Sequence, residues 1–296
     1  MNQIRYIRKS SQFYLSNPAP CPYLKGQIER KVFTYLTGPR AEALNDSLTR
    51  KGFRRSQTIA YKPACETCTA CISVRVNIEQ FKPTRSLKRI LNKNKDIEIR
   101  PSLPHTTRQQ YQLLNRYLEA RHKKGGMADM TSSEYISMVE DTQVSTYLVE
   151  YCLNPNKKTD SEKSNIYNPH STYNMQNKSI DNKQNESTYN KQNKTDSTAK
   201  FSPIQEMKEG KLVATALVDK LSDGLSMVYS FFDPSLAERS LGSFMILDQI
   251  ERARKENLPY LYLGYWVADC QNMAYKQRFQ PLEKLTDKGW QAFTPI

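Results

Sequence analysis

Residues 154–200 are the part of this 296-residue chain that most restricts how it can fold. The segment is rich in Asn, Lys, Ser and Gln, and it contains no Leu, Val, Phe or Trp. Two nearly identical octamers lie within it, STYNMQNK at 171–178 and STYNKQNK at 187–194. Such a composition buries too little apolar surface to offset the entropy that is lost on ordering. The sequence therefore predicts a disordered insertion with folded structure on either side.

The residues around the insertion predict strands that pair across it. Residues 143–153 and 211–221 are both rich in the β-branched and aromatic side chains that are typical of strands. A third such stretch, 226–233, follows a Ser-Asp-Gly turn signal. The insertion is then an enlarged hairpin loop, which is tolerated because the entropy of loop closure grows only logarithmically with length.

Helices are predicted before and after these strands. Residues 108–126 and 132–141 carry helical patterns, and the first ends in two glycines that suit a helix C-cap. Residues 240–257 place apolar side chains on one helical face, and a further strand follows at 260–267. The order helix, helix, three strands, helix, strand predicts an α/β fold in which helices flank a mixed sheet.

The formal net charge of +14 is concentrated in the first third of the chain. Residues 1–100 contain 20 Lys and Arg against 7 Asp and Glu. A one-sided basic region favours a polyanion as partner, most simply nucleic acid, although a solvated basic surface explains the same count. We therefore divide the chain into a basic N-terminal domain at 1–100 and a C-terminal domain at 101–296, which the insertion interrupts.

Two further features bear on where the chain resides. It has no run of 18 apolar residues, and its first residues lack the apolar core of a signal peptide. Six cysteines in 296 residues are too few for a disulfide scaffold. We expect a cytoplasmic protein with reduced thiols and no membrane partner.

Cys65, Cys68 and Cys71 form a C-x2-C-x2-C pattern, and Cys21 lies far upstream. Three thiols at this spacing can converge on one metal, and thiolates suit zinc or the iron of an iron–sulfur cluster. The fourth ligand would have to be Cys21, brought close by the fold. Three reduced structural cysteines explain the same spacing, so both interpretations stay open.

Several segments of the chain, in order, resemble bacterial aspartate/glutamate leucyltransferases, which are relatives of arginyl-tRNA–protein transferases. The longest is residues 46–91, DSLTRKGFRRSQTIAYKPACETCTACISVRVNIEQFKPTRSLKRIL. The other matching segments are residues 21–36, 121–135, 228–250 and 262–283. Together they span nearly the whole chain except the insertion, which makes the resemblance specific.

The resemblance implies an activity, a fold and partners. The activity is transfer of leucine from leucyl-tRNA to the α-amine of proteins that begin with Asp or Glu, which marks them for degradation by the N-end rule pathway. The fold is an acyltransferase fold of the N-acetyltransferase type, with a separate N-terminal region that carries the cysteines. The partners are leucyl-tRNA and acidic protein N-termini, and transfer requires no cofactor.

Residues 239–244 bear on that implied fold, because N-acetyltransferases hold a cofactor pyrophosphate at a [RQ]-x-x-G-x-[GA] loop that opens a helix. Arg239 and Gly242 match this pattern, but Phe244 replaces the last small residue and would crowd a pyrophosphate. The departure argues against acyl-CoA and is compatible with a donor carried by tRNA. Two alternatives to the transferase are an acyl-CoA N-acyltransferase and a non-catalytic RNA-binding module with a structural zinc.

The implied reaction needs no nucleophilic side chain, because an aminoacyl ester is already activated and the attacking amine needs only deprotonation and positioning. Candidate helpers are polar residues at strand ends and in loops, each of which could instead be a core or turn residue. These candidates are Tyr229, Ser230, Asp233, Tyr265 and Tyr275.

The acidic first residue of an acceptor needs a cation, ideally a guanidinium that binds the carboxylate through two hydrogen bonds. We predict Arg55 or Arg75 for this role, since both flank the cysteine loop. Lys276 and Arg278 could serve either substrate. The basic residues predicted to hold tRNA phosphates are Arg54, Lys62, Lys82, Arg85, Lys88 and Arg89.

Overall fold

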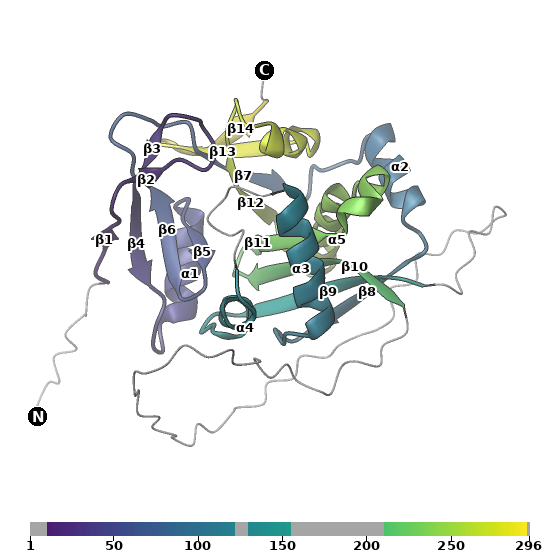
Figure 1. The fold of residues 1–296 in the computed structure, drawn as a ribbon. Coiled ribbons are helices and arrows are strands. Elements are labelled where there is room, and N and C mark those ends of the chain that lie inside the picture. Colours follow the sequence, from purple (N-terminus) through teal and green to yellow (C-terminus); the bar gives the residue numbers. More distant parts are fainter. Residues whose placement is uncertain (1–10, 122–129, 155–209, 295–296) are drawn as a thin grey trace, which may run out of the picture.

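The computed structural model describes residues 11–121, 130–154 and 210–294. They form an eight-stranded sheet, a four-stranded sheet and a two-stranded ribbon, with helices packed around the large sheet (Figure 1). The predicted disordered insertion lies outside the described residues except for Asn154, and so does the glycine pair expected to end the helix at 108–126.

The large sheet is mixed, as the sequence predicts. In spatial order its strands are β14 (Gly289–Phe293), β13 (Leu282–Thr286), β7 (Ile72–Asn77), β12 (Tyr260–Trp266), β11 (Gly224–Phe232), β10 (Lys211–Lys220), β9 (Thr146–Leu153) and β8 (Ile97–Ser102). Among the described strands of this sheet, β11 and β12 are the one parallel pair. Parallel pairing is possible here because a helix connects the two strands.

The strands on either side of the insertion do pair with each other. β9 and β10 are antiparallel, with Leu153 opposite Lys211 where the chain leaves and re-enters the sheet. β10 and β11 form the next hairpin, in which the Leu221 amide donates to the Gly224 carbonyl at 2.9 Å. The predicted strand order around the insertion is therefore confirmed.

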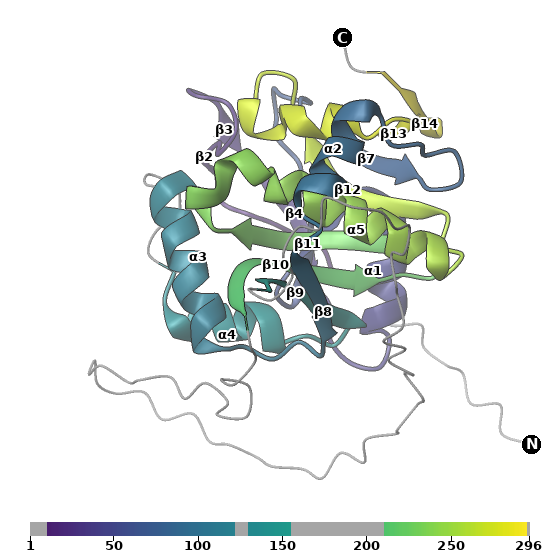
Figure 2. The same ribbon diagram turned by 90° about the vertical axis from the view of Figure 1, so that its right-hand side faces the viewer.

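One face of the large sheet is covered by α2 (Arg85–Lys93) and α5 (Leu241–Lys255) (Figure 2). Phe244, Leu247 and Ile250 of α5 are all at most 5% exposed and belong to the main hydrophobic core. The apolar face predicted for this helix is thus the face that packs on the sheet.

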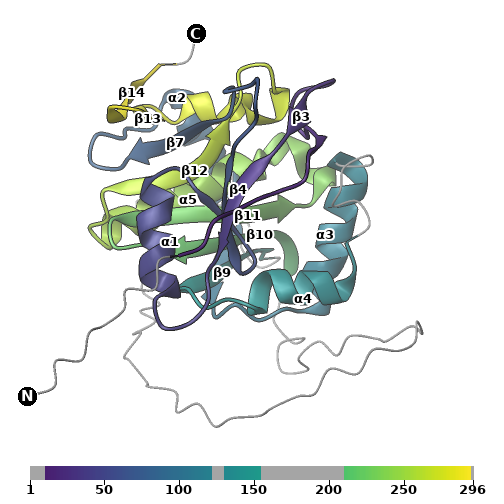
Figure 3. The same ribbon diagram turned by 90° about the vertical axis from the view of Figure 1, so that its left-hand side faces the viewer.

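The opposite face is shared between two helices and the small sheet (Figure 3). α3 (Arg108–Arg121) and α4 (Ser132–Glu140) pack over β9 to β11. α4 begins with a capping box, in which the Thr131 side chain accepts from the Glu134 amide and the Glu134 carboxylate accepts from the Thr131 amide. No helix in the described part of the chain has the length and apolar character needed to cross a bilayer.

The small sheet is built from strands between residues 14 and 63, and one helix packs on it. Its strands in spatial order are β1 (Tyr14–Leu15), β4 (Lys31–Tyr35), β6 (Ile59–Pro63) and β5 (Arg54–Ser56). Ala60 of the sheet and Leu48 of α1 (Ala41–Arg50) are buried together on one face. The ribbon formed by β2 (Ala19–Pro20) and β3 (Ile28–Glu29) lies beside the loop that carries Cys65, Cys68 and Cys71.

The sheets do not divide at residue 100, where the sequence analysis places a domain boundary. β7 and α2 precede that residue and β8 spans it, yet β7 pairs with β12 and β13, and β8 pairs with β9. The physical reason is that the basic first third contributes strands to the interior and to one edge of the large sheet. Charge composition therefore does not mark the change from one sheet to the other.

Candidate active site where β11 and β12 separate

β11 and β12 run side by side for three residues and then separate. The paired residues are Gly224 with Tyr260, Leu225 with Leu261 and Ser226 with Tyr262. No later pair follows between the described strands, although both continue beyond this point. Diverging strands leave peptide groups inside a sheet without a strand partner, so side chains or a ligand must satisfy them. This opening is called the split below.

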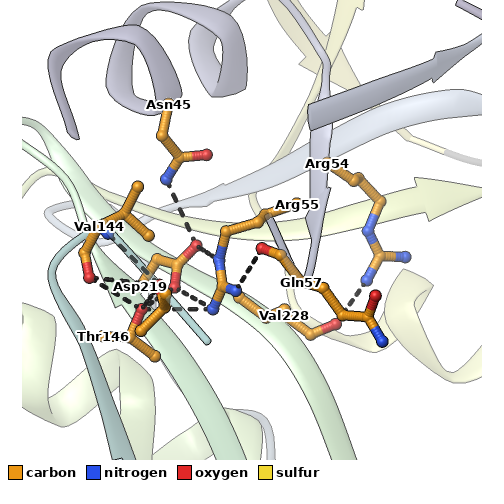
Figure 4. A network of polar contacts seen from close by, with 9 residues as sticks. Asn45, Arg54, Arg55, Gln57, Val144, Thr146, Asp219 and Val228 are labelled. Carbon is orange, nitrogen blue, oxygen red and sulfur yellow. Dashed lines mark hydrogen bonds and ion pairs between the residues drawn. The ribbon is translucent and has the colours of Figure 1, made fainter. Parts of the chain in front are cut away.

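Arg54 reaches the split from β5 of the small sheet. Its Nη2 donates to the Val228 carbonyl oxygen of β11 at 2.9 Å (Figure 4). On the other side, its guanidinium lies against Gly264 of β12, where an added Cβ would stand 2.6 Å from the Arg54 Cζ. Arg54 thus bridges the two separated strands, and only a residue without a side chain fits beside it.

Tyrosines surround the Arg54 guanidinium closely enough for their hydroxyls to affect its pKa. They are Tyr61, Tyr23, Tyr265 and Tyr275. Burial lowers the pKa of Arg54, but the tyrosines outweigh burial and the pKa lies above its ordinary value. The guanidinium is 5.8 Å from the centre of the Tyr265 ring. Among the described residues no carboxylate pairs with Arg54, so a permanent positive charge stands in the split without an anion.

Lys276 is a second cation beside the split, on the short helix η3 (Gln271–Arg278). It is 6% exposed, and its Nζ donates to the Tyr265 carbonyl oxygen. Burial and the nearby charge of Arg54 lower the pKa of Lys276 to about 7. A lysine with such a pKa is neutral in about half of the molecules near pH 7, and this neutral form can accept a proton from a substrate.

A cavity of about 10 Å³ lies between Arg54 and the strands β7 and β12. Ser73, Ser226, Tyr262 and Trp290 are among the residues that line it. This volume is enough for one water molecule and far too small for an amino-acid residue. A substrate that enters this cavity would therefore have to displace some of the side chains that line it.

Three of the five residues predicted to assist catalysis are tyrosines, and the structure places them differently. Tyr265 is 1% exposed, and its hydroxyl lies 3.0 Å from the Gly52 carbonyl oxygen and 3.2 Å from that of Tyr61. It therefore fastens the small sheet to β12. The Tyr229 hydroxyl is buried and has no hydrogen-bond partner among the described residues, while Tyr275 lies near Arg54.

Asp233 and Ser230 lie farther along β11. Asp233 caps the short helix η2 (Pro234–Arg239) by accepting from the Ser235 amide at 3.1 Å. It also accepts from the Ser235 hydroxyl at 2.6 Å and pairs with Lys211 at 3.0 Å. Ser230 is half-buried in β11, opposite Ala216 of β10. These contacts give Asp233 a structural task, and the catalytic roles suggested for all five residues stay predictions.

The two arginines predicted to bind an acceptor carboxylate each bind a carboxylate of the chain itself. Arg55 contacts both Asp219 oxygens, at 2.7 and 2.8 Å, and both side chains are 1% exposed (Figure 4). Arg75 contacts Glu283 at 2.7 Å, and its guanidinium lies 3.3 Å from the Tyr260 ring centre. An acceptor could reach either guanidinium only by exchanging with these partners.

The residues predicted to hold tRNA phosphates fall into two places. Lys82, Arg85, Lys88 and Arg89 are exposed on or just before α2, across the large sheet from the small sheet. Arg54 lies in the split, and the half-buried Lys62 is on β6. One contiguous site does not contain all six, and their contact with tRNA stays a prediction.

The loop that opens α5 differs from expectation in one respect. Phe244 is 5% exposed and packs in the core, with its ring centre 5.9 Å from that of Tyr151, so its side chain does not stand over the loop. Arg239 instead binds both Asp96 oxygens, at 2.7 and 2.9 Å. This loop therefore differs from a pyrophosphate site because Asp96 already binds Arg239, and not because Phe244 crowds the loop.

The four clustered cysteines lie next to the split. Cys21 lies between β2 and β3, and Cys65, Cys68 and Cys71 lie between β6 and β7; all six cysteines of the chain are free thiols. Burial, and then the other three thiols, raise the pKa of Cys71 to about 12. Burial is also the main cause that raises the pKa of two nearby tyrosines, that of Tyr23 to about 12 and that of Tyr265 well above its ordinary value.

Four thiols are donors that suit zinc or iron. In the part of the chain that the structure describes, however, no three His, Cys, Asp or Glu side chains are positioned to hold a metal. The four thiols are therefore suitable ligands in kind, but the described side chains are not arranged to bind a metal ion.

Two family descriptions match this chain: "Arginine-tRNA-protein transferase, N terminus" over residues 19–89, and the "C terminus" counterpart over residues 162–286. Aspartate/glutamate leucyltransferase of Sinorhizobium medicae is 47% identical over 285 residues, 96% of this chain and 93% of the relative. That of Methylobacterium sp. is 48% identical over 283 residues, 96% of each chain. The chain belongs to the aspartate/glutamate leucyltransferase family. A looser likeness, with a TM-score of 0.38 and 9% identity, covers 66% of this chain and 45% of L-PGS from Bacillus licheniformis.

The two halves of this leucyltransferase-family chain meet at the split. Arg54 lies in the N-terminal match, whereas Val228, Gly264 and Lys276 lie in the C-terminal match. The contacts of Arg54 with Val228 and Gly264 therefore join residues of the N-terminal and the C-terminal match in one site. The chain is an enzyme of the aminoacyl-tRNA–protein transferase class, and this junction is its candidate active site.

Proposed function

We propose that this enzyme transfers leucine from leucyl-tRNA to the α-amine of proteins that begin with Asp or Glu. The relatives' name, aspartate/glutamate leucyltransferase, supports the choice of substrates. The observation that carries the proposal is the Arg54 guanidinium, which stands in the split without a carboxylate partner among the described residues. A carboxylate is the ligand that such a guanidinium binds best, because two parallel hydrogen bonds can form.

Arg54 is the residue that we propose for the acceptor carboxylate. Arg55 and Arg75 were the candidates from sequence, but each would have to release Asp219 or Glu283 first. Breaking a buried ion pair leaves an uncompensated charge and costs about 3–5 kcal/mol. Arg54 carries no such cost, because one of its nitrogens contacts a backbone carbonyl and no side-chain anion has to leave.

Lys276 is the residue that we propose to take the proton from the acceptor α-ammonium. Its pKa of about 7 lies close to that of an α-amino group, about 7.7–8.0. The freed amine nitrogen attacks the ester carbonyl carbon of leucyl-tRNA, and an amide bond forms. The ester carbon–oxygen bond breaks, and the 3′-terminal ribose oxygen of the tRNA leaves with a proton.

We further propose that the large sheet is of the N-acetyltransferase type. The separation of β11 and β12 after three paired residues supports this, because it provides an opening in the sheet where an acyl group can lie. Acyl-CoA is the less favoured donor, since Arg239 of the matching loop is held by Asp96. A non-catalytic RNA-binding module is the remaining alternative, and it predicts tRNA affinity without transfer.

We also propose that transfer itself needs no cofactor, and that zinc or an iron–sulfur cluster at the cysteines would have a structural task. To bind it, the described thiols would first have to turn toward one common point. The donor set of four thiols supports the second part. Metal analysis of protein purified without oxygen tests it. The setting that we propose is the cytoplasm, where charged tRNA is found, and the product is a protein marked for N-end rule degradation.

The proposed activity is tested by incubating the enzyme with labelled leucyl-tRNA and peptides that differ only in residue 1. We expect label on peptides that begin with Asp or Glu, and little on those that begin with Asn, Gln or Ala. Label on none of them, together with measurable tRNA binding, would support the RNA-binding module instead. Label from acyl-CoA in place of leucyl-tRNA would support an N-acyltransferase.

A further inference from the structure

The small sheet exposes a set of aromatic rings that the split does not use. Tyr14 and Tyr35 are 42% and 51% exposed. The Tyr14 ring stacks on Phe33 with centres 5.5 Å apart and an angle of 29°, and Tyr35 meets both rings edge-on at 5.8 and 6.0 Å. Tyr14, Phe33 and Tyr35 are called the aromatic ladder below. Contiguous exposed apolar side chains of this kind are typical of surfaces that bind a partner.

The aromatic ladder lies on the face of the small sheet that leads to Arg54. Residues directly opposite one another in neighbouring strands project from the same face. Tyr14 lies opposite Phe33, Phe33 opposite Tyr61, and Tyr61 opposite Arg54. The Tyr61 ring is in turn 6.4 Å from the Tyr265 ring at the split. One face therefore carries aromatic rings on three strands, β1, β4 and β6, and Arg54 on the fourth, β5, from solvent to the candidate active site.

The charge of this surface favours a polyanion. Residues 11–71, which build the small sheet, contain nine Lys and Arg against four Asp and Glu. Lys31 projects from the same face as the aromatic ladder, with its Nζ 5.5 Å from the Tyr61 ring centre. Rings that offer open faces beside cations are the combination that binds single-stranded nucleic acid, because unpaired bases stack on the rings and phosphates meet the cations.

We propose that the aromatic ladder binds the unpaired 3′ nucleotides of aminoacyl-tRNA by base stacking and directs the ester toward Arg54 and the split. The inference rests on the proposed function, since that function supplies tRNA as the donor. Protein acceptors have only their first residue in common, whereas every tRNA ends in an unpaired 3′ strand. A fixed row of rings therefore suits the RNA better than the acceptor protein.

The test compares the binding of two uncharged leucine tRNAs, one intact and one without its four unpaired 3′ nucleotides. Wild-type protein should bind the intact tRNA more tightly. The double variant Tyr14→Ala, Tyr35→Ala should lose about tenfold or more in affinity for intact tRNA, the loss expected when rings that stack on bases are removed. Its affinity for the truncated tRNA should match that of the wild type.

Two controls separate stacking from other effects. Tyr14→Phe with Tyr35→Phe keeps the rings and should keep the affinity, while Leu103→Ala removes a side chain that is 48% exposed outside the small sheet and should change nothing. If the alanine variant fails to fold, the double variant Tyr14→Leu, Tyr35→Leu takes its place in the assay, because leucine keeps apolar bulk but has no ring.

Equal losses for both tRNAs, or no loss for either, would overturn the proposal. Displacement of truncated and intact tRNA alike by a peptide that begins with Glu would assign the surface to the acceptor and would also overturn it. The assay measures the binding of uncharged tRNA and involves no leucine transfer. It therefore reports on the aromatic ladder even if leucine transfer itself is not observed.

Discussion

The guanidinium of Arg54 lies where a side chain at Gly264 would have to stand. A Cβ at position 264 would be 2.6 Å from the Arg54 Cζ and 2.7 Å from its Nε, and Gly264 has a φ of +72°. The small sheet thus places its arginine in the large sheet through a contact that only glycine allows. If Arg54 binds the acceptor, the identity of residue 264 should matter for the reaction as well as for folding.

Gly264→Ala should therefore lower both stability and transfer. The added methyl collides with Arg54, and alanine at positive φ costs about 1 kcal/mol or more. We expect a lower thermal midpoint and at least about a tenfold loss of kcat/KM, which corresponds to about 1.4 kcal/mol. Gly38→Ala is the matched control, because Gly38 has a similar φ of +77° with nothing within 4 Å of an added Cβ. Gly38→Ala should lose stability but keep kcat/KM. If both variants lost kcat/KM equally, Arg54 would not be the cause of the loss in Gly264→Ala.

Arg55 should matter for folding rather than for the choice of acceptor. Arg55→Met leaves Asp219 charged and 1% exposed, so the free energy of unfolding should fall by about 3–5 kcal/mol in urea denaturation. Arg55→Met with Asp219→Leu removes both charges and should recover much of that loss. If Arg55 served the acceptor, Arg55→Lys would instead reduce transfer to Asp- and Glu-peptides selectively.

Transfer should depend on pH through Lys276. Because the pKa of Lys276 is lowered to about 7, its neutral, proton-accepting form accumulates as pH rises through 7. With acceptor at saturation, kcat should rise between pH 6 and 8 in the wild type. Lys276→Gln should lower kcat and move the rise to the higher pH at which the acceptor amine itself loses its proton, about 7.7–8.0. Lys288→Gln, at an exposed lysine on the β13–β14 turn, should leave the profile unchanged. An identical pH profile in Lys276→Gln would exclude it as the proton acceptor.

The exposed basic residues of α2 should contribute to tRNA affinity through counterion release. Replacing Arg85, Lys88 and Arg89 by Ala should reduce the steepness of log affinity against log salt, by about 0.7–0.9 for each phosphate contact that is lost. Thermal unfolding should be little affected, since all three side chains are exposed. An unchanged slope would place the tRNA elsewhere, for example entirely on the small sheet.

The sequence predicts those parts of the fold whose signals are local. The apolar face of α5 and the strands on either side of the insertion follow from residue patterns alone, and both are found. The position of β7 could not be predicted, because its partners β12 and β13 lie about 190 and about 210 residues later in the chain. Pairings of that kind depend on the whole fold rather than on any local pattern.

The candidate site was predicted in part. Successive residues of a strand face opposite sides, so Arg54 and Arg55 had to have different surroundings once 54–56 was a strand. A strand at 54–56, which we did not predict from the sequence, would have placed the two arginine side chains on opposite faces. The lowered pKa of Lys276 has no sequence signal, because it results from burial by residues that are distant in the chain.

The central claim is that Arg54, in the split, recognises the acidic first residue of the acceptor. The most direct test is transfer of leucine from labelled leucyl-tRNA to paired peptides that begin with Glu or Gln, by wild type and by Arg54→Lys, with tRNA affinity measured alongside. Lysine keeps the charge but cannot form two parallel hydrogen bonds to a carboxylate. We predict that the Glu-over-Gln preference in kcat/KM falls about ten- to a hundredfold, with tRNA affinity unchanged. An unchanged preference, or equal losses on both peptides that follow a loss of tRNA affinity, would contradict the account.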